Sequence, residues 1–106
     1  MSAGQVELTA EKRTVLGKQV KRLRRQGWVP GVLYGPGFDS LPLQFEARAL
    51  QHALSHAKGG QLFRLKIQGQ AQPEVAILHE VQRDPIYGTL LHVDFYRVTA
   101  PESISA

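Results

Sequence analysis

The 106-residue sequence contains no cysteine. This absence excludes disulfide bonds, thiolate zinc sites and cysteine nucleophiles, and it is compatible with a reducing compartment. Long hydrophobic runs are also missing, because no stretch approaches the roughly 20 apolar residues of a membrane span. The first residues, MSAGQVELTAEKR, lack the apolar centre of a secretory signal peptide. We therefore expect a soluble, cytoplasmic protein.

The length fits one compact domain and leaves no room for a second one of full size. Hydrophobic residues make up 42% of the chain, which is close to the usual globular value and predicts a buried core. We expect the folded domain to cover residues 1–98, with 99–106 as a tail or the start of a linker.

Positive charge is concentrated in one segment. The net charge is +4, and the stretch from Lys12 to Arg25 contains seven basic residues and no acid, so the rest of the chain is net negative. The seven are Lys12, Arg13, Lys18, Lys21, Arg22, Arg24 and Arg25. A solvated surface usually mixes both signs, whereas a phosphate backbone neutralises such a cluster. The distribution therefore predicts a polyanionic partner.

Alternating apolar residues predict about six strands. They lie near 5–10, in WVPGVLYG, in LPLQFE, in QLFRLKIQG, in PEVAILHEVQ and in LLHVDFYRV. The fourth and fifth are expected to form a hairpin. In the last strand, His92, Asp94 and Tyr96 alternate with an apolar set, so they should share one outward face.

Two helices are expected between these strands. KQVKRLRRQG predicts a short basic helix with Gly27 at its C-terminal cap, and it has so few apolar anchors that we expect it to order on RNA. The spacing of Ala and Leu from Ala47 to Lys58 predicts a second helix that ends at Gly59-Gly60. The predicted fold is α+β, a small six-stranded antiparallel β-barrel with two short helices.

Three sets of residues have competing interpretations. His92 and Asp94 could form an acid/base pair, but no nucleophile, phosphate loop or metal triad accompanies them, so a recognition face is favoured. His52 and His56 have metal-binding spacing without a hydrolytic glutamate, and we interpret both as exposed helix residues. Trp28 is expected to pack, while Tyr34 could pack or bind RNA.

The ordered set LTAEKRTVLGK, KRLRRQGWVPGVLYG, EVQRDPIYG and LLHVDFYRV resembles a known family. It is similar to the bacterial 5S rRNA-binding proteins of the large ribosomal subunit, the family numbered twenty-five that includes general stress proteins of the Ctc type. The resemblance covers nearly the whole chain. It implies a six-stranded barrel with two helices bound to loop E of 5S rRNA. Longer members continue into a second β-rich domain, and PESISA resembles the start of the connection to that domain.

The resemblance also implies site residues. Arg13 and Lys18 would contact phosphates, and Arg22 and Arg24 would enter the adjoining groove. Further RNA-binding residues would lie in the basic helix and on the outer face of the sheet. These further residues are Lys21, Arg25, Tyr34, Gln82, His92 and Asp94. The turn departs from the family, since Asp84 stands where a histidine is common.

The predicted function is a non-catalytic 5S rRNA-binding protein of the large ribosomal subunit, monomeric when free. No membrane partner, metal site or cofactor is expected, apart from Mg²⁺ that accompanies the RNA. Two alternatives remain open, a stress-related binder of another structured RNA and a small enzyme that uses His92 and Asp94.

Overall fold

The computed structural model describes residues 5–13, 20–35, 38–57 and 61–98. The elements in chain order are β1 (Gln5–Lys12), α1 (Val20–Arg25), β2 (Trp28–Gly35), β3 (Phe38–Glu46), α2 (Ala47–His56), β4 (Leu62–Ile67), β5 (Glu74–Arg83) and β6 (Leu90–Arg97). Lys18, the glycines after α2 and the segment 99–106 lie outside the described residues, so the predictions made for them stay predictions.

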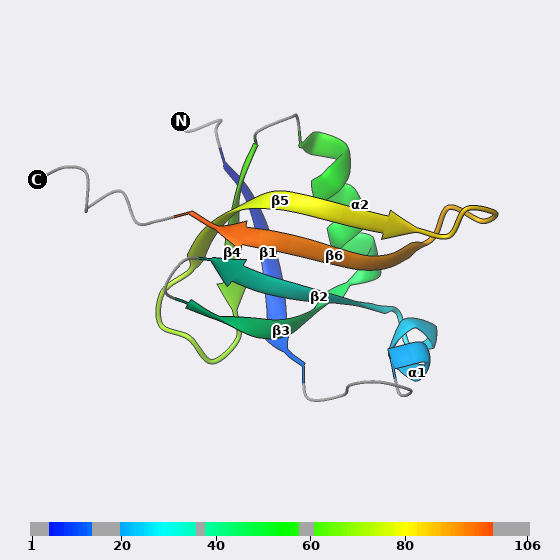
Figure 1. Ribbon diagram of the computed structural model, residues 1–106, viewed down its shortest axis with the longest axis horizontal. Helices are drawn as coiled ribbons and strands as arrows, with labels where there is room; N and C mark the ends of the chain where they lie inside the picture. Colours follow the sequence, from blue (N-terminus) through cyan, green and yellow to red (C-terminus); the bar gives the residue numbers. More distant parts are fainter. Residues whose placement is uncertain (1–4, 14–19, 36–37, 58–60, 99–106) are drawn as a thin grey trace, which may run out of the picture.

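The strands close into a barrel in the order β1-β3-β2-β6-β5-β4 (Figure 1). The barrel, the two helices and the β4–β5 hairpin confirm the sequence predictions. The predicted antiparallel pairing holds for four of the six strand pairs, whereas β1 pairs with β4 and β2 pairs with β6 in parallel. Strand alternation determines which side chains face inward, but it carries no information on the direction of a distant partner strand.

The core is built from the inward residues of these alternating strands. Phe45, Phe63 and Phe95 are fully buried and meet at its centre, with ring centroids of Phe95 at 5.5 Å from Phe45 and 5.1 Å from Phe63. Burying an aromatic side chain of this size contributes about 1.5–3 kcal/mol each. Because alternate side chains of a strand face opposite sides, the buried residues of each strand determine which of its residues face outward.

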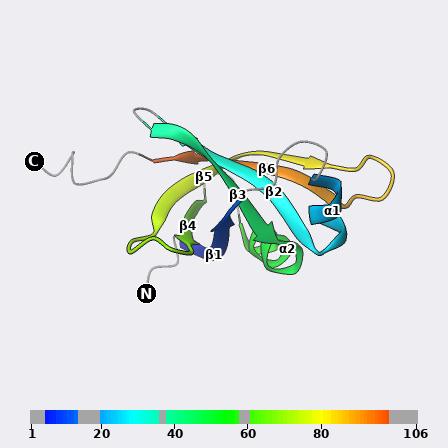
Figure 2. The ribbon, with the colours of Figure 1, turned by 90° about the horizontal axis from the view of Figure 1, so that it is seen from below.

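Helix α2 covers the barrel on the side away from β2, β6 and β5, as Figures 1 and 2 show together. It packs Leu50 and Ala53 into the core and contacts β1 and β3. It ends at His56, two residues before the predicted end, because the chain becomes extended at Ala57. Among the described residues, no helix is long and apolar enough to cross a membrane.

Helix α1 is short and basic, as predicted. Its anchor is Leu23, which is buried, and the following turn ends at Gly27 with a positive φ of 92°. Such a backbone conformation strains residues that carry a Cβ, and glycine adopts it freely. Gly27 therefore stops the helix and directs the chain into β2, which confirms the predicted cap.

The parallel contact between β2 and β6 depends on Gly31. A Cβ atom at this position would lie 2.6 Å from the carbonyl oxygen of Val93 and 2.8 Å from the ring of Phe45. Real side chains do not approach backbone oxygen this closely, so only glycine lets the two strands pair here while Phe45 fills the core.

Candidate nucleic-acid interface

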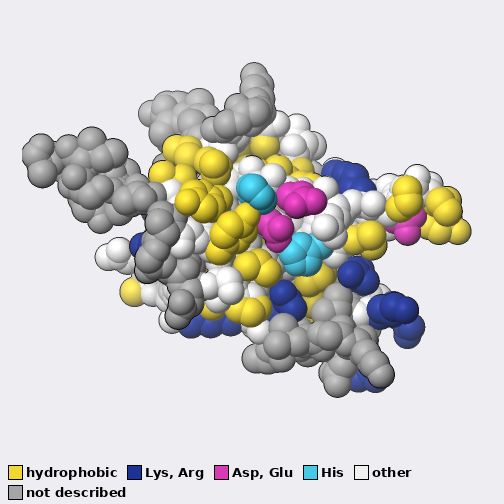
Figure 3. All heavy atoms as spheres, in the orientation of Figure 1, with side chains coloured by type: hydrophobic (Ala, Val, Ile, Leu, Met, Phe, Trp, Pro, Cys, Tyr) yellow, Lys and Arg dark blue, Asp and Glu magenta, His cyan; other side chains and the backbone are white. Residues whose placement is uncertain are grey.

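The outer surface of β2, β6 and β5 carries one continuous set of polar and aromatic side chains. Val32 of β2 pairs with Asp94 of β6, and Asp94 pairs with Glu80 of β5. Further along, Tyr34 pairs with Tyr96. We call this surface the open face, and its residues are Val32, Tyr34, His79, Glu80, Gln82, His92, Asp94 and Tyr96. Figure 3 shows histidine and acidic side chains at its centre and Lys and Arg at its edge.

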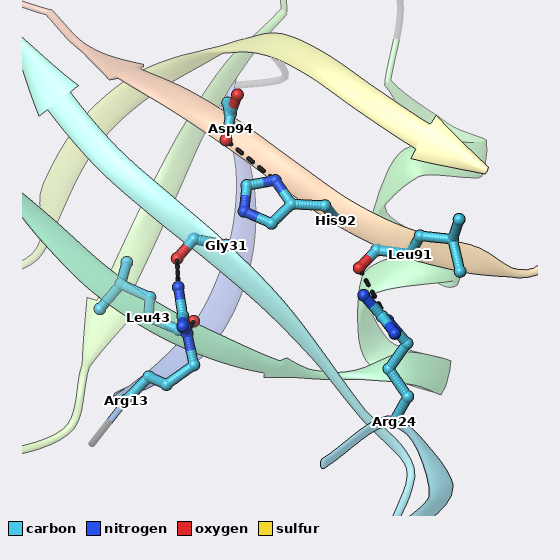
Figure 4. A network of polar contacts seen from close by, with 7 residues as sticks. All are labelled: Arg13, Arg24, Gly31, Leu43, Leu91, His92 and Asp94. Atoms are coloured by element: carbon cyan, nitrogen blue, oxygen red, sulfur yellow. Dashed lines mark hydrogen bonds and ion pairs between the residues drawn. The ribbon is translucent and has the colours of Figure 1, made fainter. Parts of the chain in front are cut away.

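His92 and Asp94 form a pair at the centre of this face (Figure 4). The Nδ1 atom of His92 lies 3.1 Å from the Oδ1 atom of Asp94, and the two side chains are 28% and 23% exposed. A carboxylate that accepts a hydrogen bond from the Nδ1–H group fixes the orientation of the ring. The Nε2 atom is then the ring nitrogen that can face a ligand. The pair therefore presents hydrogen-bonding atoms in a set geometry.

Two carboxylates and a tyrosine hydroxyl share the same neighbourhood. Glu80 and Asp94 are directly opposite each other on antiparallel strands, a position where like charges repel. Partial desolvation raises the pKa of Tyr34, and the negative charges of Asp94 and Glu80 raise it further. The hydroxyl therefore stays protonated and can donate a hydrogen bond.

An aromatic cluster lies beside the carboxylates. The ring of Tyr34 meets His79 edge-on at a centroid distance of 5.7 Å and Tyr96 edge-on at 5.5 Å. Edge-to-face contacts of this kind hold rings in place while leaving part of each ring accessible. Tyr34, which the sequence left undecided, thus packs against its neighbours and still belongs to the open face.

The basic helix is tied to the edge of the open face. The Nε atom of Arg24 donates to the carbonyl oxygen of Leu91 at 3.1 Å, next to His92 in the chain (Figure 4). Lys21, Arg22 and Arg25 are exposed. Arg24 therefore holds α1 against the start of β6, while the other three basic side chains extend into solvent.

Arg13 lies at the border of β2 and β3 and contacts the protein backbone. Its Nε atom donates to the carbonyl of Leu43 at 3.0 Å, and its Nη2 atom donates to the carbonyl of Gly31 at 3.2 Å. Burial lowers the pKa of Arg13 from its ordinary value, although a guanidinium remains charged at neutral pH. Part of its donor capacity therefore serves the barrel.

The structure brings together most of the residues that the sequence singled out. Tyr34, Gln82, His92 and Asp94 share the open face, and α1 adjoins it. Their actual contacts with RNA stay predictions. Sequence reasoning did not name Glu80 or His79 as site residues, because a bulge in the β5–β6 pairing lies between Leu78 and Glu80 and alternation does not reveal it.

The turn between β5 and β6 is internally organised. The Asp84 carboxylate accepts the backbone N–H groups of Ile86 at 2.8 Å and Tyr87 at 3.0 Å, and these bonds lower its pKa. Arg83 donates to the carbonyl of Gly88 across the same turn. Asp84, the departure from the family pattern, therefore stabilises the loop itself.

Comparison with known proteins gives a consistent result. Residues 8–95 match the model of the Ribosomal L25p family. The chain is 39% identical over 109 residues to a protein from Moorella thermoacetica that is named large ribosomal subunit protein bL25. The matched region covers 100% of this chain and 51% of that relative. A protein of the same name from Akkermansia muciniphila is 44% identical over 93 residues, covering 87% of this chain and 45% of the relative.

The chain thus spans about half the length of the curated relatives that it matches. The family match begins within β1, ends within β6, and includes both helices and every open-face residue except Tyr96. The chain belongs to the ribosomal L25p family.

Proposed function

We propose that this chain is a structural, non-catalytic protein of the large ribosomal subunit that binds 5S rRNA at the internal loop called loop E. The family and the names of the relatives support the ribosomal assignment. The observation that carries the RNA assignment is the open face, with its fixed polar groups beside a basic helix. Under this proposal the protein works in the bacterial cytoplasm, is monomeric when free, and needs no cofactor beyond Mg²⁺ that accompanies the RNA.

The basic helix supplies affinity in this proposal. Lys21, Arg22 and Arg25 extend from α1 without an acidic residue in the helix, so they can lie along a phosphate backbone. Each phosphate contact releases counterions, which makes binding strong at low salt and weaker at high salt. Such contacts orient the protein on the RNA and carry no sequence information.

The carboxylates determine which part of the RNA meets the open face. Glu80 and Asp94 would repel phosphate groups, so the centre of the face cannot lie on the backbone. Carboxylates accept hydrogen bonds from base amino and imino groups and from 2′-hydroxyls. We therefore orient the RNA with its backbone on α1 and its base edges or sugars over Asp94, His92 and Tyr34.

An irregular RNA helix suits this arrangement better than a regular one. The major groove of A-form RNA is too deep and narrow for side chains to reach the bases. An internal loop of non-Watson–Crick pairs changes the groove width and exposes base edges. A rigid sheet face with few polar groups can then select the loop by shape and by a small number of hydrogen bonds.

The catalytic alternative has little support in the geometry. Within the described ranges, no cluster of three or more His, Cys, Asp or Glu residues could hold a metal ion. His92 and Asp94 form a two-residue pair on a sheet surface, and the described residues that pair with them across the sheet include no serine, threonine or cysteine nucleophile. Recognition accounts for the pair without requiring further groups.

The RNA assignment predicts a preference for the internal loop. Binding of 5S rRNA should be measured at physiological salt against a version whose loop E is replaced by a Watson–Crick duplex of equal length. We expect the replacement to weaken binding by at least about tenfold, because a regular duplex hides the edges that the open face reads. Equal affinity would refute loop-specific binding, and tighter binding to another structured RNA would favour the stress-related alternative.

Asp94 should contribute to selection more than to affinity for RNA in general. We expect Asp94→Asn to reduce discrimination between the natural loop and the duplex version by about 1–3 kcal/mol, because the amide cannot accept in the same way as the carboxylate. Glu46→Gln removes the same charge at the end of β3, outside the open face, and should leave discrimination unchanged. Equal weakening on both RNAs by Asp94→Asn would argue against this role.

The arginines of α1 should differ in effect. Arg22→Ala should reduce the salt slope of binding by about one unit, as expected for one lost phosphate contact. Arg24→Ala should also reduce the slope and cost more affinity, because it removes the bond that ties α1 to Leu91 and so displaces the exposed basic side chains from the phosphates. Lys66→Ala, on β4, serves as the control with the same charge change. If both arginine variants showed the same salt slope as Lys66→Ala, the proposed contacts of α1 with the RNA phosphates would be contradicted.

A further inference from the structure

Two histidines on α2 lie close together on the side of the barrel away from the open face. His52 and His56 are one helical turn apart and exposed. Their Nε2 atoms are 3.2 Å apart, and the ring centroids are 4.5 Å apart with an angle of 67° between the planes. The two Nε2 atoms therefore lie in direct contact distance of each other.

This separation matches a chelating pair. Zinc–imidazole bonds measure about 2.0–2.1 Å, so two ligands on one edge of a tetrahedral site lie about 3.3 Å apart. A hydrogen bond between the two rings also fits 3.2 Å, but exposed imidazoles exchange it readily for bonds to water. The sequence spacing alone left the pair as ordinary surface residues, whereas the 3.2 Å separation of the two Nε2 atoms favours metal binding.

The groove between α2 and β1 favours a cation, whereas Arg24, Arg25 and Arg48 line a second groove that His52 alone of the pair borders. His52 and His56 line a groove of about 600 Å³ between α2 and β1. Three carboxylates, Glu7, Glu11 and Glu46, line the same groove, and none of its lining residues is Lys or Arg. Glu7 forms salt bridges with Arg64 and Lys66, and Glu11 accepts a bond from Gln44, so the acids contribute field rather than direct ligands.

We propose that His52 and His56 bind one divalent cation of the zinc class through their Nε2 atoms. Imidazole nitrogen suits zinc, copper and nickel, whereas magnesium and calcium prefer oxygen ligands. Among the described residues no third ligand completes the set, so the remaining positions are taken by water or by a group from another molecule. The site does not overlap the open face, because α2 lies on the other side of the barrel (Figures 1 and 2).

Zinc titration tests this proposal. Isothermal titration calorimetry with Zn²⁺ at a pH of about 7.5 should show one site per chain, and the imidazole NMR signals of His52 and His56 should shift together. His52→Gln and His56→Gln should each weaken binding by at least about tenfold, because a bidentate site becomes monodentate. Lowering the pH to about 5.5 should weaken it too, since histidine coordinates only through an unprotonated nitrogen.

His79→Gln is the matched control, because it removes a histidine from the open face and should leave zinc binding unchanged. Far-ultraviolet circular dichroism of each variant checks that α2 is retained. The proposal is wrong if the wild-type protein shows no heat and no imidazole shift at about 1 mM Zn²⁺, a concentration that would detect even a weak two-ligand site. It is equally wrong if His52→Gln and His56→Gln bind zinc as the wild type does.

Discussion

The parallel pairing of β2 with β6 is the contact on which the rest of the structure depends. These strands are far apart in the sequence, and Gly31 brings them together because any Cβ would collide with the Val93 carbonyl and with Phe45. The pairing closes the barrel and places Tyr34 beside Tyr96 and Val32 beside Asp94. The hydrogen bond from Arg13 to the carbonyl of Gly31 adds a further tie at the same point. The open face is therefore a consequence of how the core closes.

Charge is divided between two regions that perform different tasks in the proposed complex. The basic side chains of α1 lie at the edge of the open face, and the carboxylates Glu80 and Asp94 lie at its centre. A uniformly basic surface would bind any polyanion, because phosphate contacts do not depend on sequence. Carboxylates at the centre oppose placement on the backbone and favour groups that donate hydrogen bonds. The hydrogen bond from Arg24 to the carbonyl of Leu91 connects the two regions.

Much of this could be predicted from the sequence, for physical reasons that particular residues make clear. Alternation around Val93 and Phe95 placed His92, Asp94 and Tyr96 outward, because successive strand residues point to opposite sides. The cap at Gly27 followed from the need for a positive φ. Alternation within one strand could not reveal the parallel neighbours, the bulge near His79 or the opposition of Glu80 and Asp94, because these depend on pairing between distant segments. The hydrogen bonds from the Arg13 side chain to backbone carbonyls could not be predicted for the same reason.

The most direct test of the account is to map where RNA touches the protein. Backbone amide NMR signals of the isotope-labelled chain should be followed while a 5S rRNA fragment containing loop E is added. We predict shifts for Val32, Tyr34 and Asp94 on the open face and for Arg22 and Arg25 on α1, with Ala49 and His56 on α2 unchanged, because these two residues line the groove beside β1. Shifts concentrated on α2 and β4, with the open face unaffected, would contradict it.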